Sequence, residues 1–318
     1  MGQEIFSDSF IFRTESAIWF GKNTHSPPSV AQALSFTPLS RGQTLARHGT
    51  FIELEGADTR LSHFASGSVG GWGAQMGVNQ HGVVVGCHLA GTKLAGRGKP
   101  GVSGGDLVRL ALEQARSSRD ARDIITRAVE RYGQGASLRL PALNGYDSSF
   151  IIADFHEAWE LETAGTWWAA RRVPGYAARS DCMEIGETFD LAASGAEDYA
   201  RDKHWAPAGE PFHFSGAFAR RWPGAPSSAR RRQQTMAAGL KALSGLAAPD
   251  QNHFMVLLGR HAGQAPGRRG DICVHGRGER ARTAASMLVK VGFSGLPRVW
   301  YSEGQPCSGE FRELLFKT

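Results

Sequence analysis

The sequence is poor in cysteine, and none of its apolar runs is long enough to cross a membrane. Its four cysteines, Cys87, Cys182, Cys273 and Cys307, form neither a CxxC pair nor the dense spacing of a disulfide-rich domain. We therefore expect buried or free thiols. The first residues also lack the basic start and apolar core of a signal peptide, so we expect a cytoplasmic protein with no membrane partner.

Motifs of metal and nucleic-acid binding are missing as well. The eleven histidines include no HExxH motif and no His/Cys cluster of zinc spacing, so we expect no metal and no cofactor. The net charge of +6 is a mild excess of 36 basic over 30 acidic residues. No sustained basic helix or aromatic ladder accompanies it, so we expect no nucleic-acid partner.

What is present is a pattern of strands and helices long enough for one large domain. Helical periodicity predicts helices around residues 107–111 and 121–132, the second ending at Gly133, and another over residues 227–243. Alternation predicts a meander over residues 148–154, 158–163 and 166–173, and further strands at 183–185, 273–274 and 284–291. This order favours two packed sheets with helices outside.

Residues 7–26 predict a β-hairpin near the start of the chain. Ser7, Ser9 and Ile11 would share one face of the first strand. The return strand would cover residues 17–20, and Gly21 would then turn the chain so that the polar residues after it lie beside Ser7. The other interpretation is an ordinary edge strand that ends in a polar turn.

The hairpin has a mechanistic interpretation if the bond before Ser7 is cut. The freed α-amine has a pKa of about 7.7–8.0 and can act as the base for the hydroxyl of its own residue. No distant catalytic triad would then be required.

Several ordered motifs resemble the secernin and dipeptidase family of N-terminal nucleophile (Ntn) hydrolases, peptidase family C69. They are SDSF (7–10), FGKN (20–23), WGAQMGVNQHGV (72–83), DLVRLALE (106–113), YGQG (132–135), FIIAD (150–154), AWELETAG (158–165) and RTAASM (282–287). The resemblance implies an α+β fold, a four-layer αββα sandwich with two mainly antiparallel sheets. It also implies self-cleavage before Ser7, which would divide the chain into a leader (1–6) and a single domain (7–318).

The resemblance further implies amide hydrolysis by the side chain of residue 7. The family nucleophile is cysteine, so Ser7 is a departure. Serine serves in other Ntn enzymes, and a serine in place of cysteine would also hold a precursor uncut; the sequence leaves both open. The other departures replace acidic or amide residues of the family and predict a less negative pocket, suited to neutral or anionic substrates. They are His25, Gln75, Gln80, the Cys87-His88 pair and Asp181.

The resemblance also suggests roles for other residues. Asn79 would donate to the oxyanion, and Lys22 with Asn23 would keep the α-amine neutral.

Asp181 and His25 would orient that amine. Arg231, or its neighbour Arg230, matches a family arginine that follows a Ser-Ser pair and would hold charge near the nucleophile. The alternative is that these arginines form a solvated helix face.

The expected partner is a small-molecule amide or a short peptide as substrate, and a homo-oligomer is compatible with the sequence. Two other functions stay open. The acyl-enzyme could be captured by an amine, which would make the protein an acyltransferase, or the fold could serve as a catalytically silent binding protein.

Overall fold

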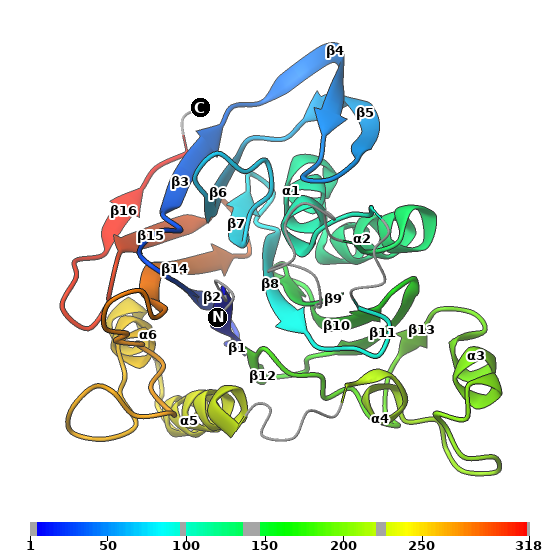
Figure 1. Cartoon of the computed structure of the whole chain (residues 1–318). Helices are drawn as coiled ribbons and strands as arrows, with labels where there is room; N and C mark the ends of the chain where they lie inside the picture. Colours follow the sequence, from blue (N-terminus) through cyan, green and yellow to red (C-terminus); the bar gives the residue numbers. More distant parts are fainter. Residues whose placement is uncertain (1–4, 96–99, 136–146, 221–226, 317–318) are drawn as a thin grey trace.

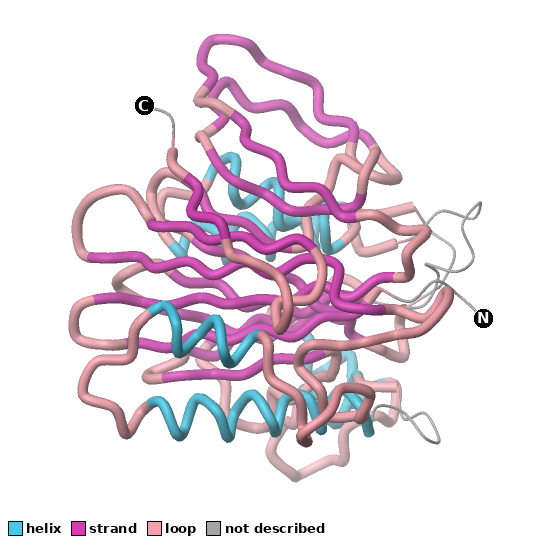
Figure 2. Tube along the Cα trace, turned by 90° about the vertical axis from the view of Figure 1, so that its left-hand side faces the viewer, coloured by secondary structure: helices cyan, strands magenta, loops and turns pink. Residues whose placement is uncertain are grey.

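Two antiparallel sheets form the centre of the computed structural model, which describes residues 5–95, 100–135, 147–220 and 227–316 (Figures 1 and 2). The first sheet has six strands in the order β12-β1-β2-β14-β15-β16. Their bounds are β1 (Phe6–Arg13), β2 (Ala17–Ser26), β12 (Tyr176–Ser180), β14 (Arg282–Gly292), β15 (Arg298–Glu303) and β16 (Arg312–Leu314).

The second sheet has eight strands in the order β13-β11-β10-β9-β8-β7-β6-β3. They are β3 (Gln32–Thr37), β6 (His63–Ser68), β7 (Met76–Asn79), β8 (Val84–Ala90), β9 (Asp147–Ala153), β10 (Ala158–Ala164), β11 (Trp167–Arg172) and β13 (Leu191–Ala192). Strands β9, β10 and β11 are the predicted meander. Strands β4 (Ser40–His48) and β5 (Glu53–Arg60) form a separate hairpin that projects from the top of the molecule in Figure 1.

Helices α1 (Gly104–Gln114) and α2 (Ser118–Tyr132) cover the outer face of the second sheet. Ser103 and Asp106 form a capping box at the start of α1, which satisfies backbone N–H groups that a helix leaves free. Gly133 ends α2 with a φ of 64°, a conformation that favours glycine. Both helices and this stop were predicted from the sequence.

Helices α5 (Ser227–Leu243) and α6 (Gln251–Leu258) cover the outer face of the first sheet. Met236 of α5 and Phe254 of α6 pack there against Phe10 and Trp19. Between the two sheets, Ile11 and Phe20 of the first sheet pack against residues of the second, such as Val78 and Ile151. Three apolar interfaces thus separate four layers, and the predicted αββα sandwich is confirmed.

The short helices α3 (Ala196–Asp202) and α4 (Phe214–Phe218) pack together beside β11. Two predicted strands are absent from the described chain, because residues 183–185 and 273–274 are irregular. Their buried apolar side chains, such as Ile185 and Cys273, cover neighbouring elements without joining a sheet.

The N-terminal hairpin forms as predicted, except at Gly21. Strand β2 runs straight through Gly21, and the turn lies at residues 14–16, where the amide of Thr14 donates to the carbonyl of Ala17. Gly21 is needed for space, since a Cβ there would come within 2.2 Å of the ring of Phe10. The polar residues that follow Gly21 reach the start of β1 through strand pairing: Thr24 is opposite Ser7.

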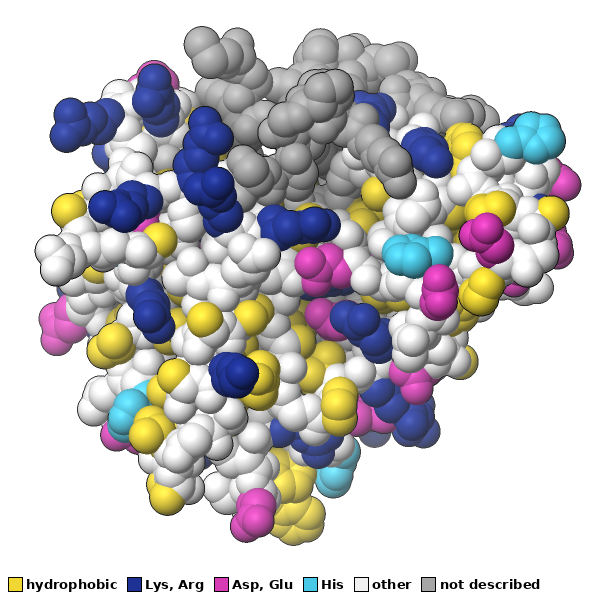
Figure 3. All heavy atoms as spheres, turned by 90° about the horizontal axis from the view of Figure 1, so that it is seen from below, with side chains coloured by type: hydrophobic (Ala, Val, Ile, Leu, Met, Phe, Trp, Pro, Cys, Tyr) yellow, Lys and Arg dark blue, Asp and Glu magenta, His cyan; other side chains and the backbone are white. Residues whose placement is uncertain are grey.

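Charged side chains of both signs lie on the face of the molecule that is seen from below (Figure 3). Figure 3 shows Lys and Arg side chains on the face seen from below, with Asp and Glu side chains between them. Among the described residues, no helix is both long enough and apolar enough to span a bilayer.

Candidate active site

Ser7 lies where the two sheets meet, with its side chain directed at β8 of the second sheet. The residue is 2% exposed. Its Oγ lies 2.9 Å from Nδ1 of His88 and 3.2 Å from the carbonyl oxygen of Cys87. Because side chains alternate along a strand, Ser9 shares this face and its Oγ lies 2.7 Å from Nε2 of the same imidazole.

His88 is therefore held between two hydroxyl groups. Burial lowers its pKa well below the usual value, and the nearby cations Lys22 and Arg179 act in the same direction. A neutral imidazole has one N–H donor and one acceptor nitrogen. When Nε2–H donates to Ser9, Nδ1 is free to accept the hydroxyl proton of Ser7. This is the order of groups that activates a serine: nucleophile, base and an orienting partner.

Sequence reasoning noted His88 only as a departure from the family pattern and did not include it in the site. The available signal was an imidazole replacing an acidic residue on a buried strand. Its contact with Ser7 joins residues 81 positions apart, so the local sequence does not reveal it.

Asp181 directly follows β12 and accepts a hydrogen bond from the backbone nitrogen of Ser7. The amide of Ser7 donates to its Oδ2 at 2.9 Å, and the amide of Leu89 donates to its Oδ1 at 3.0 Å. Burial raises the pKa of Asp181 to about 6, although Arg232 at 3.3 Å opposes this shift. The carboxyl group thus links the backbone nitrogen of Ser7 on β1 to that of Leu89 on β8.

A buried charge network lies on the opposite face of β1. Nε of Arg232 is 2.9 Å from both carboxylate oxygens of Asp8, and Nε2 of His25 is 2.9 Å from Oδ2. Burial raises the pKa of Asp8, but Arg232 and His25 outweigh it and hold the pKa below its usual range. His25 therefore acts on Asp8 and does not contact the nitrogen of Ser7.

The arginine at the site is Arg232, and the expectation of Arg231 or Arg230 is corrected. Arg230 and Arg231 are exposed, whereas the side chain of Arg232 is 6% exposed. Successive side chains on a helix point about 100° apart, so only one of three adjacent arginines can face the sheet. The sequence did not fix the phase of α5.

Lys22 and Asn23 point to opposite sides of β2. Lys22 is fully buried on the Ser7 side, and its Nζ has no hydrogen-bond partner among the described residues. Burial lowers its pKa to about 8, while the neighbouring Cys87, Asp181 and Asp8 favour its charged form.

Asn23 points outward instead. Its Nδ2 donates to the carbonyls of Leu258 and Ile272, at 2.9 and 3.0 Å, and its Oδ1 accepts from Ser286. The predicted grouping of Asn23 with the amine is therefore corrected. Asn23 ties β2 to the outer layer.

Asn79 does not lie at this site, which corrects the predicted oxyanion donor. Its Nδ2 donates to the carbonyls of Leu112 and Ala115 at the end of α1, and its Oδ1 accepts from the amides of His81 and Val83. All of its polar atoms are occupied. Asn79 satisfies carbonyls that a helix end leaves free.

A pocket of about 240 Å³ opens beside Ser7. Its wall includes Ser7, His88 and Asp181, the apolar side chains of Ile5, Phe51, Leu89 and Val102, and several glycines, among them Gly73 and Gly105. The charged side chains among the described lining residues are Asp147 and Asp181. Two carboxyl groups in the described lining do not favour an anion, whereas a neutral substrate, the other half of the prediction, is compatible with this wall.

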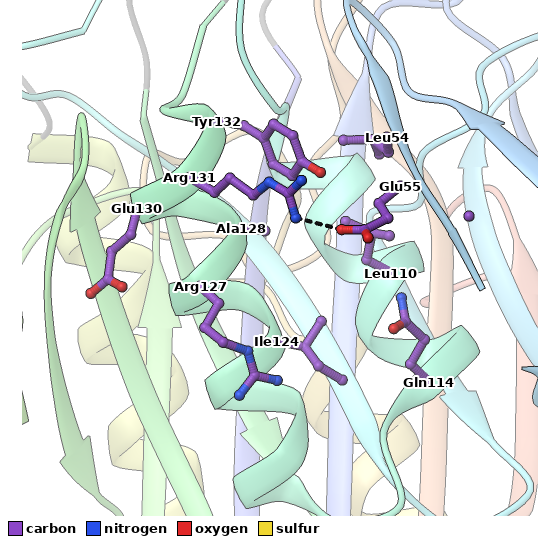
Figure 4. A pocket seen from close by; sticks show the side chains of 11 residues that line it. Leu54, Glu55, Leu110, Gln114, Ile124, Arg127, Ala128, Glu130, Arg131 and Tyr132 are labelled. Carbon is purple, nitrogen blue, oxygen red and sulfur yellow. Dashed lines mark hydrogen bonds and ion pairs between the residues drawn. The ribbon is translucent and has the colours of Figure 1, made fainter.

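A second cavity, of about 550 Å³, lies on the outer side of α1 and α2, beneath β5 (Figure 4). An ion pair between Arg131 and Glu55 crosses it. Its described lining contains no serine, cysteine or histidine. It therefore lacks the pairing of a serine or cysteine with an imidazole that the Ser7 site has, and we do not take it as the candidate active site.

Histidines and cysteines without zinc spacing in the sequence nevertheless come together in the fold. The ligand atoms of His261, Cys273, His275 and Cys307 all lie within 4.8 Å of one another. These residues come from separate loops, so sequence spacing did not reveal them.

Comparison with known proteins supports the fold and the family. Two solved structures of conjugated bile acid hydrolase from Clostridium perfringens, both of variants, are similar to the chain. One has a TM-score of 0.56 and 12% identity and covers 97% of each chain; the other has a TM-score of 0.54 and 11% identity and covers 98% of this chain and 97% of that one. This likeness shows an Ntn-hydrolase fold.

The family model of peptidase family C69 matches residues 81–238, and the predicted resemblance to that family is confirmed. The matched stretch contains His88, Asp181 and Arg232 but not Ser7. The resemblance to a peptidase family supports an enzyme that hydrolyses amide bonds.

Proposed function

We propose that this protein is an amide hydrolase whose nucleophile is Ser7. The observation that carries the proposal is the 2.9 Å separation between Oγ of Ser7 and Nδ1 of His88, next to a pocket. A serine hydroxyl is a weak nucleophile unless a base removes its proton. The imidazole supplies that base, and Asp181 holds the nitrogen of the same serine.

The first reaction would be removal of residues 1–6. Strand β1 continues through the Phe6–Ser7 bond, so the nitrogen of Ser7 is an amide and cannot act as a base. His88 would accept the hydroxyl proton while Oγ attacks the carbonyl carbon of Phe6. The C–N bond then breaks, the nitrogen takes up the proton, and water hydrolyses the resulting ester. The leader leaves with a free carboxylate.

Cleavage would give Ser7 a free α-amine beside Asp181. In substrate turnover, this amine or His88 would take the hydroxyl proton and return it to the leaving nitrogen. Buried Lys22 would favour a neutral amine, because a second cation nearby disfavours protonation. The size of the pocket fits a small amide or a short peptide.

Ser7→Ala and Ser7→Cys test the proposal. Intact mass over time should show that Ser7→Ala keeps residues 1–6, and an amidase assay on dipeptides and N-acyl amino acids should show no turnover. Ser7→Cys should retain both reactions and speed them, because a thiol is the better nucleophile at neutral pH.

Loss of the leader from Ser7→Ala at the parental rate would refute the nucleophile assignment. Repeating the assay with an added amine separates hydrolysis from acyl transfer, since only acyl transfer yields a new amide.

A further inference from the structure

Three loops on the outer side of the first sheet bring together two histidines and two cysteines. His261 follows α6, Cys273 and His275 lie on the segment before β14, and Cys307 lies in the turn after β15. In sequence these residues are 12, 2 and 32 positions apart, unlike the paired spacing of zinc fingers.

The three separations that involve His275 are close to those around a tetrahedral metal ion. Nε2 of His275 lies 3.2 Å from Nε2 of His261, 3.5 Å from Sγ of Cys273 and 3.2 Å from Sγ of Cys307. Zinc bonds of about 2.0 Å to nitrogen and about 2.3 Å to sulfur in a tetrahedron place two nitrogens about 3.3 Å apart, and nitrogen and sulfur about 3.5 Å apart. An ion at the centre could reach all four atoms.

Hydrogen bonding alone does not account for the contacts of His275. A ring nitrogen carries either one hydrogen or one lone pair in the ring plane, so it can form one strong hydrogen bond. Nε2 of His275 faces three groups within 3.5 Å. A cation satisfies the cluster, because each of the four atoms then directs a lone pair at the same point.

We propose that His261, Cys273, His275 and Cys307 bind one zinc ion. Two thiolates and two imidazoles in a tetrahedral arrangement suit Zn²⁺. Four protein ligands leave no position for water or substrate, which marks a structural site and not a hydrolytic one. This site replaces the sequence-based expectation of a chain without metal.

The bonded neighbours of the ligands indicate what the ion would stabilise. The amides of Ile272 and Cys273 both donate to the carbonyl of Arg260, and the carbonyl of Ile272 accepts from Asn23 of β2. The amide of Val274 donates to Oγ1 of Thr283, which contacts His25. Zinc would thus fix the loop that contacts the outer face of β2 through Asn23.

Metal analysis of the purified full-length protein tests the proposal directly. Inductively coupled plasma mass spectrometry should find about one zinc per chain, and Co²⁺ in its place should give the visible bands of a tetrahedral site with thiolate charge transfer. Cys273→Ser and His275→Ala should lose the metal. Cys182→Ser and His156→Ala, a buried cysteine and an exposed histidine outside the cluster, should keep it.

Melting temperatures with and without zinc separate the stability that the ion would provide from the stability lost when a side chain is changed. Cys307 is exposed, so Cys307→Ser by itself should cost little stability. It should nevertheless melt below the parent protein in zinc, and the two should melt together after chelation. A parent protein that stays free of zinc when zinc is supplied, or a Cys273–Cys307 disulfide in its intact mass, would overturn the proposal. Neither metal content nor melting temperature depends on amidase activity, so this test is independent of the proposed function.

Discussion

Oγ of Ser7 and Nδ1 of His88 lie 2.9 Å apart, although the two residues belong to different sheets. Ser7 is held from β1 and His88 from β8, so the pair forms only when the sheets are packed. Under the proposed mechanism, the hydroxyl can therefore be activated only in the folded chain.

The role of His88 can be tested with His88→Asn, which keeps a polar group near Nδ1 but removes the base. We expect leader removal to slow by about 10²–10⁴-fold, the usual contribution of general base catalysis. The measurement is intact mass over time after refolding. Ser9→Ala, which removes only the partner of Nε2, should slow the reaction less.

His63→Asn is the matched control for this change. His63 is also a buried histidine, but its Nδ1 lies 2.8 Å from the carbonyl of Leu61 and it has no place in the proposed mechanism. Its leader should be removed at the parental rate. Equal slowing in His63→Asn and His88→Asn would mean that His88 acts through the fold alone.

The sequence predicted the parts of this structure that depend on local pattern. Alternation separated Ser7 and Ser9 from Phe10 on β1, helical periodicity located α1, α2 and α5, and the family motifs identified the sandwich. The strand faces and the helices follow from the period of a strand or helix, which neighbouring residues determine, whereas the four-layer sandwich was implied by the family resemblance.

Contacts between distant elements were not predictable in the same way. Asn79 binds the end of α1, His88 meets Ser7 across two sheets, and the four ligands of the metal cluster lie on three loops. The choice of Arg232 over Arg231 required the rotation of α5 about its axis. Each of these depends on how finished elements pack, which a single sequence does not specify.

Asn79→Ala should destabilise the protein without changing its chemistry. The substitution removes two donors from buried helix-end carbonyls and two acceptors from backbone amides. We expect a loss of about 2–4 kcal/mol in the free energy of unfolding, because unpaired buried groups are costly. Urea denaturation measures the loss, and turnover per folded molecule should stay unchanged.

Exposed Asn252 in α6 serves as the control, and Asn252→Ala should change stability by less than about 0.5 kcal/mol. A large fall in turnover with parental stability would return Asn79 to the site as an oxyanion donor.

Arg232→Met should destabilise the protein far more than Arg231→Met. Asp8 is fully buried, and removing Arg232 leaves its carboxylate without its main counterion. Breaking a buried ion pair costs about 3–5 kcal/mol. The neighbouring exposed Arg231 should change stability by less than about 0.5 kcal/mol. Chemical denaturation of the two variants gives the comparison, and equal losses would contradict the assignment of Arg232.

The last prediction concerns Asp147, a buried carboxyl group in the wall of the pocket. Burial raises its pKa from 3.8 to about 6, while hydrogen bonds from Thr92 and Gly165 oppose the shift. Below pH 3.8 the group is protonated in both the folded and the unfolded chain. Between 3.8 and about 6 the folded chain binds the extra proton, so its stability falls as the pH rises through this window.

A shift of about two pKa units corresponds to about 3 kcal/mol. Asp147→Asn removes the titration and keeps an oxygen that can accept from Thr92 and Gly165. The free energy of unfolding of the variant should therefore fall less than that of the parent between pH 4 and pH 7, by up to about 3 kcal/mol. Urea denaturation at several pH values measures both slopes. Parallel slopes would mean that Asp147 titrates alike in the folded and unfolded chain, and that its carboxylate is solvated in the pocket.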